Sequence, residues 1–274
     1  MNLKSDCLAC LFNQSLRVAK NLKLDEEQSK SLLHVASSAI AHYNEVSPPV
    51  AASDLYPKLA DCIGVEDVYE QLKAHSTAEA IKLLPSVRQS VEQEPNRVKG
   101  AIRAAVAGNV IDFATPTHFD LYEEFEKVFH TPFTLDDETA FLERLERADS
   151  LMILGDNAGE HVFDKLLLEE IGKAYPNLQC YYAVRGCPII NDVTMKEATQ
   201  IDIESVATVI DSGVDTPGLV YERASDAFMA LYNQMDLIIA KGMGNYECLN
   251  EVADDRIYHL FKVKCDVVSQ SVGA

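Results

Sequence analysis

Apolar side chains in residues 1–110 recur at the three- and four-residue spacing of amphipathic helices. In the first of these segments Leu8, Leu11 and Leu16 share one face, and Asp6 is placed to cap it. No strand-like run interrupts this half, so residues 1–110 predict an all-helical N-terminal domain. A second helix is predicted over 25–43 and ends before Ser47-Pro48-Pro49, and a third follows Ser53, with Pro57 near its start and Gly64 at its end. A fourth is predicted over 67–84 and is closed by Pro85. A fifth runs from a cap at Asn96 to about Ala107, with Gly108 at its C-terminus.

The pattern changes in the second half, where short apolar runs alternate with helix-length segments. The stretch 111–148 between the halves predicts a loop with one or two helices, one of them beginning near Asp136. Strands are predicted over 151–154, 178–184, 205–210, 236–240 and 265–269. Strands that alternate with helices indicate a parallel sheet covered by helices, so residues 111–274 predict an α/β domain.

Polar side chains follow four of the predicted strands, at the point where each strand ends. In an open parallel sheet, ligands bind beyond the carboxyl ends of the strands. A purely structural protein has no need to gather acids, amides and bases at one rim, so their common placement indicates a functional site. These side chains are Asp156 and Asn157, Arg185 with Asn191 and Asp192, Asp211 with Asp215, and Lys241 with Asn245.

The segment Asp156-Asn157-Ala158-Gly159-Glu160 is the sharpest of these motifs. Two adjacent oxygen ligands at a strand end can reach one cation, and Asp192 can supply a third. Such hard ligands suit Mg²⁺, Mn²⁺ or a related divalent ion. The competing interpretation is a turn in which the side chain caps the following helix.

Two loops carry positive charge at the same rim. Arg185, in a loop with Gly186 and Pro188, can hold a phosphate or a carboxylate, although a surface position explains it equally well. The stretch Lys241-Gly242-Met243-Gly244-Asn245 can cradle an anion with its amide groups, or form no more than a tight turn. It matches neither the P-loop nor the dinucleotide-binding glycine pattern.

The charge balance restricts the partners. Lys and Arg total 24 and Asp and Glu total 43, which gives a net charge of −19. This charge repels a phosphate backbone, so a nucleic acid partner is not expected, and a small anionic substrate would need local positive charge. No apolar run is long enough to span a membrane, and no secretory signal is visible, so we expect a cytoplasmic protein. Cys7-x-x-Cys10 has ligand spacing but lacks a second pair, so packing, redox and metal roles stay open.

Taken in order, these motifs resemble the metal-dependent damage-control phosphatases, a family first defined as a domain of unknown function. The resemblance spans nearly the whole chain, and Cys7-x-x-Cys10 with Gln14 is similar to the small prokaryotic branch. The matching segments are 107–113, 156–160, 185–186 with 188–192, 213–218 and 241–247.

The resemblance implies a helical N-terminal portion packed on a Rossmann-like α/β/α domain. It also implies that a divalent metal is held by Asp156, Asn157 and Asp192. By the same resemblance, Lys241 and Asn109 face the phosphate, and Asp215 and Glu160 lie near the substrate.

These features lead us to expect hydrolysis of small phosphorylated metabolites. Bound Mn²⁺, Mg²⁺, Co²⁺ or Ni²⁺ would polarise a phosphoryl oxygen, and Lys241 would offset the developing charge. Asp192 or Asp215 would handle a proton, while Arg185 and Asn245 would contact the substrate.

Two other functions fit the same pattern. A binding module that senses a metal or a phosphorylated metabolite would carry much the same residues. An S-adenosylmethionine-dependent methyltransferase is less consistent, because it predicts a glycine-rich loop after the first strand and an acid at the end of the second.

Overall fold

Helices follow one another without a strand through the first part of the chain. The computed structural model describes residues 1–110 and 121–273. The helices of the first part are α1 (Ser5–Asn21), α2 (Glu26–Ile40), α3 (Pro48–Ile63), α4 (Glu70–Gln93) and α5 (Arg97–Val110). Gly64 ends α3 in the left-handed conformation, and the Asn96 side chain accepts hydrogen bonds from the first turn of α5, as predicted.

Several helix boundaries differ from the predictions; α5, for example, runs past Gly108 to Val110. Lys4, not Asp6, precedes α1, and its side chain makes no capping bond. Pro48 and Pro49 begin α3 instead of ending α2, because a proline at the first helical positions loses no hydrogen bond that the helix needs.

Pro57 and Pro85 both lie inside helices, where the sequence had predicted a start and a stop. Each removes one backbone hydrogen bond. Burial of the turns on either side offsets this loss: Leu55 and Leu59 flank Pro57, and Leu83 and Val87 flank Pro85.

Five parallel strands form one sheet in the order β3-β2-β1-β4-β5. The strands are β1 (Ser150–Leu154), β2 (Gln179–Val184), β3 (Thr208–Asp211), β4 (Leu237–Lys241) and β5 (Ile257–Leu260). The predicted strand over 265–269 is wrong, since these residues lie in and before helix α12 (Asp266–Val272). The real edge strand β5 has only four half-buried residues and therefore gives a weak apolar signal.

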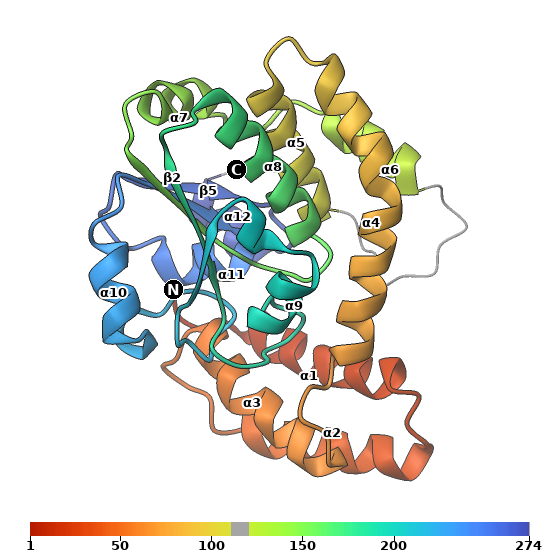
Figure 1. Cartoon of the computed structure of the whole chain (residues 1–274). Helices are drawn as coiled ribbons and strands as arrows, with labels where there is room; N and C mark the ends of the chain where they lie inside the picture. Colours follow the sequence, from red (N-terminus) through yellow and green to blue (C-terminus); the bar gives the residue numbers. More distant parts are fainter. Residues whose placement is uncertain (111–120, 274) are drawn as a thin grey trace.

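The remaining helices connect and cover the strands. They are α6 (Leu121–Phe129), α7 (Glu138–Leu145), α8 (His161–Ala174), α9 (Met195–Gln200), α10 (Asp226–Tyr232) and α11 (Gly242–Leu249). Helices α6 and α7 (Figure 1) lie in the stretch 111–148, where a loop with one or two helices was predicted. The start of that stretch, and with it the end of the 107–113 motif, lies outside the described residues.

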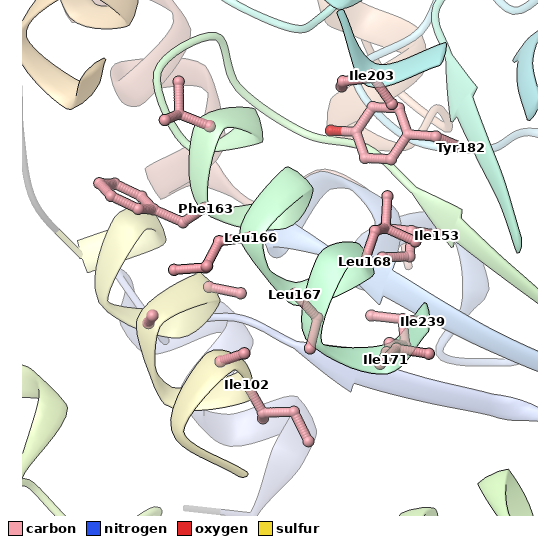
Figure 2. Packing of buried hydrophobic residues seen from close by; sticks show 14 of the residues in the cluster. Ile102, Ile153, Phe163, Leu166, Leu167, Leu168, Ile171, Tyr182, Ile203 and Ile239 are labelled. Atoms are coloured by element: carbon pink, nitrogen blue, oxygen red, sulfur yellow. The ribbon is translucent and has the colours of Figure 1, made fainter. Parts of the chain in front are cut away.

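The side chains of β1 alternate between two apolar layers. Leu151 and Ile153 pack with α5 and α8 on one face of the sheet. Figure 2 shows Ile153 together with side chains of these two helices. Met152 and Leu154 pack with α10 and α11 on the other. The α/β/α arrangement expected from the sequence is therefore confirmed.

Helices α1, α2 and α3 enclose an apolar cluster of their own, centred on Leu32, Leu55 and Leu59. The buried side chains of α4 and α5 instead join the core of the sheet, and Figure 1 shows α4 running from the α1–α3 group toward α5 and α6. The division predicted at residues 110 and 111 stays a prediction. No helix in the described ranges is long and apolar enough to cross a membrane.

Candidate active site

Asp156, Asn157 and Asp192 come together just beyond the carboxyl ends of β1 and β2. Val193 N–H donates to the Asp156 carbonyl at 2.8 Å, and Ala158 N–H donates to the Asn191 carbonyl at 2.8 Å. These bonds place Asn157 directly opposite Asp192 in a short antiparallel bridge. A loop after one strand is therefore fastened to a loop after its neighbour, and the two motifs form one site.

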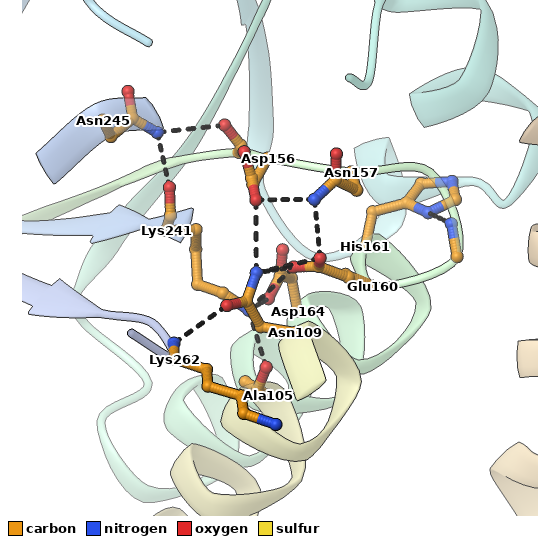
Figure 3. A network of polar contacts seen from close by, with 12 residues as sticks. Ala105, Asn109, Asp156, Asn157, Glu160, His161, Asp164, Lys241, Asn245 and Lys262 are labelled. Carbon is orange, nitrogen blue, oxygen red and sulfur yellow. Dashed lines mark hydrogen bonds and ion pairs between the residues drawn. The ribbon is translucent and has the colours of Figure 1, made fainter. Parts of the chain in front are cut away.

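The Asp156 carboxylate lies among amide donors (Figure 3). Its Oδ2 accepts hydrogen bonds from Asn157 Nδ2 at 2.7 Å and from Asn109 Nδ2 at 3.2 Å. Glu160 accepts from the same two amides, at 2.7 Å from Asn157 and 2.9 Å from Asn109. Because its amide nitrogen faces both carboxylates, Asn157 turns its amide oxygen away from them.

Asn109 connects this network to the segment after β5. Its Oδ1 accepts a hydrogen bond from Lys262 N–H at 3.0 Å, while its Nδ2 is shared by Asp156 and Glu160. Both polar ends of the side chain therefore have protein partners. A phosphate contact by Asn109, which the resemblance implies, stays a prediction.

Negative charge accumulates in the site. Burial raises the pKa of Asp156 well above its ordinary value, and the charges of Glu160 and Asp192 raise it further. Burial also raises the pKa of Asp192, although Arg185 opposes the shift. A bound cation would relieve this repulsion.

Arg185 supplies the positive charge closest to Asp192. Its Nε donates to Asp192 Oδ2 at 2.7 Å, and both side chains are 3% exposed. The Nη2 atom of Arg185 is buried without a hydrogen-bond partner among the described residues. Buried donors are almost always paired in folded proteins, so an unpaired one is unusual. This nitrogen can donate a hydrogen bond to an anionic ligand.

Lys241 lies deeper than the sequence suggested. Its side chain is 0% exposed, and its Nζ donates to Asp164 Oδ1 and to the Ala105 carbonyl, each at 2.7 Å. Glu160 Oε2 lies 3.9 Å from the same nitrogen. The predicted contact with a phosphate is untested, and in this structure Lys241 holds α5, α8 and β4 together.

Asn245 is likewise fully engaged with the backbone. Its Oδ1 accepts from Leu219 N–H at 2.9 Å, and its Nδ2 donates to the Lys241 carbonyl at 2.7 Å and more weakly to the Gly155 carbonyl at 3.3 Å. It therefore joins the loops that surround the site, and the predicted substrate contact stays a prediction.

Two glycines at the start of α11 allow neighbouring groups to lie close to its backbone. Gly242 has φ +77°, and a side chain there would overlap the Asp156 carboxylate. A side chain on Gly244 would overlap the Pro217 carbonyl. The two glycines thus leave room for the Asp156 side chain and for the backbone of the 213–218 segment against α11.

Asp215 lies at the rim and forms an ion pair that the sequence did not reveal. Both of its carboxylate oxygens accept hydrogen bonds at 2.8 Å from Arg223 Nη1, which also donates to Ser53 Oγ of α3 at 2.9 Å. Asp215 is 47% exposed and so remains accessible to a substrate. Its predicted catalytic role is untested.

Sequence reasoning missed two residues of the site. Asp164 follows Glu160 by one helical turn on α8, and that spacing was a usable signal. Lys264 is an exposed residue whose positive charge opposes the raised pKa of Asp156. It was missed because it follows β5, the strand that the sequence did not predict.

The residues present fit a hard divalent ion. The predicted set offers two carboxylates and an amide oxygen, and the repulsion among the neighbouring acids favours a cation. Within the described part of the chain, no three His, Cys, Asp or Glu side chains are grouped to hold a metal by themselves. The amide of Asn157 would therefore be an essential part of the ligand set.

Comparison with known proteins adds a family assignment. A family model described as the damage-control phosphatase ARMT1-like domain matches residues 3–274. The chain is 32% identical to the damage-control phosphatase PH1575 of Pyrococcus horikoshii, across 99% of this chain and 94% of that protein. It is 29% identical to a damage-control phosphatase of Archaeoglobus fulgidus, across 100% and 96% of the two chains.

The fold matches as well as the sequence. The crystal structure of a DUF89 family protein from Pyrococcus horikoshii superimposes with a TM-score of 0.91 at 31% identity. The match covers 100% of this chain and 96% of that one. The likeness therefore extends through both the α1–α3 group and the sheet.

Proposed function

The chain belongs to the family of damage-control phosphatase ARMT1-like domains and is a phosphatase. We propose that it hydrolyses phosphomonoesters of small metabolites with a divalent metal held by Asp156, Asn157 and Asp192. The observation that carries the metal proposal is the antiparallel bridge that sets Asn157 opposite Asp192 beside the Asp156 carboxylate.

A divalent ion bound there would supply a Lewis acid that polarises a phosphoryl oxygen. Mn²⁺, Mg²⁺, Co²⁺ and Ni²⁺ all accept such oxygen ligands. Glu160 supports the ligand set without joining it, because it accepts a hydrogen bond from Asn157 Nδ2 and so turns the amide oxygen outward.

Arg185 is the residue best placed to bind the transferred group. Its Nη2 is a buried donor with no partner in the described residues, next to Asp192. A phosphoryl oxygen that accepted this bond would satisfy the donor and compensate its positive charge. Lys264 adds positive charge near Asp156 from the segment after β5.

Lys241, Asn109 and Asn245 act in this proposal as the framework of the site. Each is buried, and each has hydrogen bonds to protein groups at the polar end of its side chain. Asn109 bonds both Asp156 and Glu160, Lys241 lies beside Glu160, and Asn245 bonds the Gly155 carbonyl. In this proposal Arg185, and none of these three, binds the substrate. Asp192 and Asp215 remain the two candidates for proton transfer.

We also propose a cytoplasmic location and no nucleic acid partner. The net charge of −19 supports the second point, since it repels a phosphate backbone. The local cations Arg185 and Lys264 explain how an acidic protein can still attract a small phosphate ester.

The metal proposal is tested by removing one ligand charge. We expect Asp156→Ala and the isosteric Asp156→Asn to lower metal-dependent phosphate release from p-nitrophenyl phosphate by about 100-fold or more. Asp226→Asn, an exposed aspartate in the first turn of α10, is the control and should keep full activity.

Unchanged turnover in both Asp156 variants would refute the ligand assignment. Saturable binding of a phosphate ester, with no phosphate released under any of the four metals, would instead support the binding-module alternative.

A further inference from the structure

Some of the buried polar side-chain atoms that lack a hydrogen-bond partner belong to α4 and to Arg185. In the described residues they include Lys73 Nζ and Thr77 Oγ1 on α4, besides Arg185 Nη2. Lys73 and Thr77 lie one helical turn apart, so they share a face of α4. Ser76, next to Thr77, lies against Gly159 of the Asp156–Glu160 segment. This face of α4 therefore borders the site.

Lys73 is 1% exposed, which is unusual for a lysine and requires compensation. Its Nζ lies 2.9 Å from Asp67 Oδ2 and 3.7 Å from Glu197 Oε1. Neither carboxylate accepts a well-directed hydrogen bond from it, so its N–H groups stay unsatisfied. Glu197 is already engaged, since its Oε2 accepts bonds from both the backbone and the hydroxyl of Thr194.

Lys73 lies next to the segment that follows β2, because Glu197, 3.7 Å from its Nζ, accepts hydrogen bonds from Thr194, and Thr194 is bridged to Arg185. Lys73 on α4 and Arg185 just after β2 therefore both adjoin the segment that carries Asp192 and Thr194. Each brings a buried nitrogen that still lacks an acceptor.

We propose that Lys73 is a second anion-binding residue of this site, which holds phosphoryl oxygens from α4 while Arg185 holds them from the sheet. A phosphate offers several acceptor oxygens and can satisfy both unpartnered nitrogens at once. The inference rests on the proposed function, because it takes the anion to be the phosphoryl group of the substrate.

The test must separate anion binding from a purely structural ion pair. Lys73→Met and Asp67→Asn break the same 2.9 Å ion pair, so a structural role predicts the same consequence for both. Anion binding predicts opposite consequences, because the first variant removes the cation and the second frees it. The measurement is the Kd of inorganic phosphate, by isothermal titration with the full-length protein in the presence of Mn²⁺.

We expect Lys73→Met to weaken phosphate binding by about 10-fold or more, the loss of one charge-assisted hydrogen bond. Asp67→Asn should bind phosphate at least as tightly as the wild type. Lys82→Met, an exposed lysine on the same helix, should bind like the wild type.

If Lys73→Met fails to fold, the double variant Lys73→Met/Asp67→Asn removes both buried charges together. Its phosphate affinity should then fall below that of Asp67→Asn alone. Equal affinities in these two variants would overturn the proposal, as would equal weakening by Lys73→Met and Asp67→Asn.

The outcome is separable from that of the metal proposal. Lys73-dependent phosphate binding in a protein that releases no phosphate from p-nitrophenyl phosphate would support this inference and contradict the proposed reaction. Full turnover together with unchanged phosphate binding in Lys73→Met would contradict this inference alone.

Discussion

At the scale of single residues, burial determines which charges of the site can meet a ligand. Lys241 has the charge of a phosphate-binding residue, but Asp164 and the Ala105 carbonyl enclose it. Arg185 is almost as buried, yet one of its nitrogens lacks a partner in the described residues. We therefore propose that the unpartnered nitrogen of Arg185, and not Lys241, binds the anion.

Replacement of Lys241 distinguishes a framework role from substrate contact. We expect Lys241→Met to lower the free energy of unfolding by about 3–5 kcal/mol, because it leaves the Asp164 charge buried without its partner. Urea unfolding measures the loss. Asp164→Asn in the same chain should restore part of the stability.

The control is Lys30→Met. Lys30 and its partner Glu26 are both exposed, so the cost should be within about 1 kcal/mol. A Lys241→Met variant that is as stable as the wild type but inactive would contradict the framework role and support the phosphate contact predicted from the sequence.

His161 makes stability depend on pH. Burial lowers the pKa of His161 to about 4, and the neutral ring accepts from Gly159 N–H and donates to the Glu197 carbonyl. An unfolded histidine has a pKa of about 6.5, so between these values the unfolded chain binds a proton that the folded protein does not. The free energy of unfolding should therefore fall as the pH drops from about 6.5 to 4, by on the order of 3 kcal/mol from this group.

Urea unfolding at several pH values tests this point by comparing slopes. Between about pH 4 and 6.5, the free energy of unfolding should change less steeply with pH in His161→Gln than in the wild type. Replacement of His34, an exposed residue of α2, by Gln should leave this slope unchanged. Equal slopes for His161→Gln and the wild type would show that His161 does not provide the pH dependence.

The site residues divide according to what a sequence can reveal about them. The convergence of Asp156, Asn157 and Asp192 was predictable, because the carboxyl ends of neighbouring parallel strands share one edge. The direction of each side chain was not predictable. Whether Lys241 faces solvent or Asp164 depends on the packing of α5 and α8 against the sheet, which no local pattern encodes.

At the scale of elements, backbone geometry at the start of α11 holds the site together. Gly242 has φ +77°, and the Asp156 carboxylate occupies the space that a side chain there would fill. Gly64 at the end of α3 has nearly the same φ, +71°, but no atom lies within 4 Å of the position that a methyl group would take. The two glycines thus share the same backbone strain but differ in what a methyl group would displace.

This pair predicts a contrast in activity. Gly64→Ala and Gly242→Ala should each lose about 1–2 kcal/mol of stability from the left-handed backbone. Only Gly242→Ala should also displace Asp156, and we expect metal-dependent phosphatase activity to fall at least about 10-fold in that variant alone. Equal activity of the two variants in a p-nitrophenyl phosphate assay would contradict the seating role of Gly242.

Four of the five strands were predicted from their apolar runs, and the fifth was not. The run at 265–269 resembles a strand because of its valines. Of these five residues only Val268 is buried, and it lies on the short helix α12. Strand β5 pairs only with β4, at the edge of the sheet, and needs no strong apolar pattern. Edge position and helix–strand ambiguity in short runs account for both errors.

At the scale of the whole molecule, the site lies where the α1–α3 group and the sheet meet. Ile189 of the loop after β2 packs into the apolar cluster of that group, and Arg223 connects Ser53 of α3 to Asp215. The loops that carry Asp192 and Asp215 are thus each fastened to the helical group. A relative displacement of the two parts would alter the site.

The central claim is that Asp156, Asn157 and Asp192 hold one divalent ion. The most direct measurement is a crystal structure of the protein grown with Mn²⁺, using the anomalous signal of manganese. The account predicts one strong peak bound by oxygens of these three side chains at about 2.0–2.3 Å. A peak at other residues, or none near Asp156 in crystals that contain Mn²⁺, would contradict it.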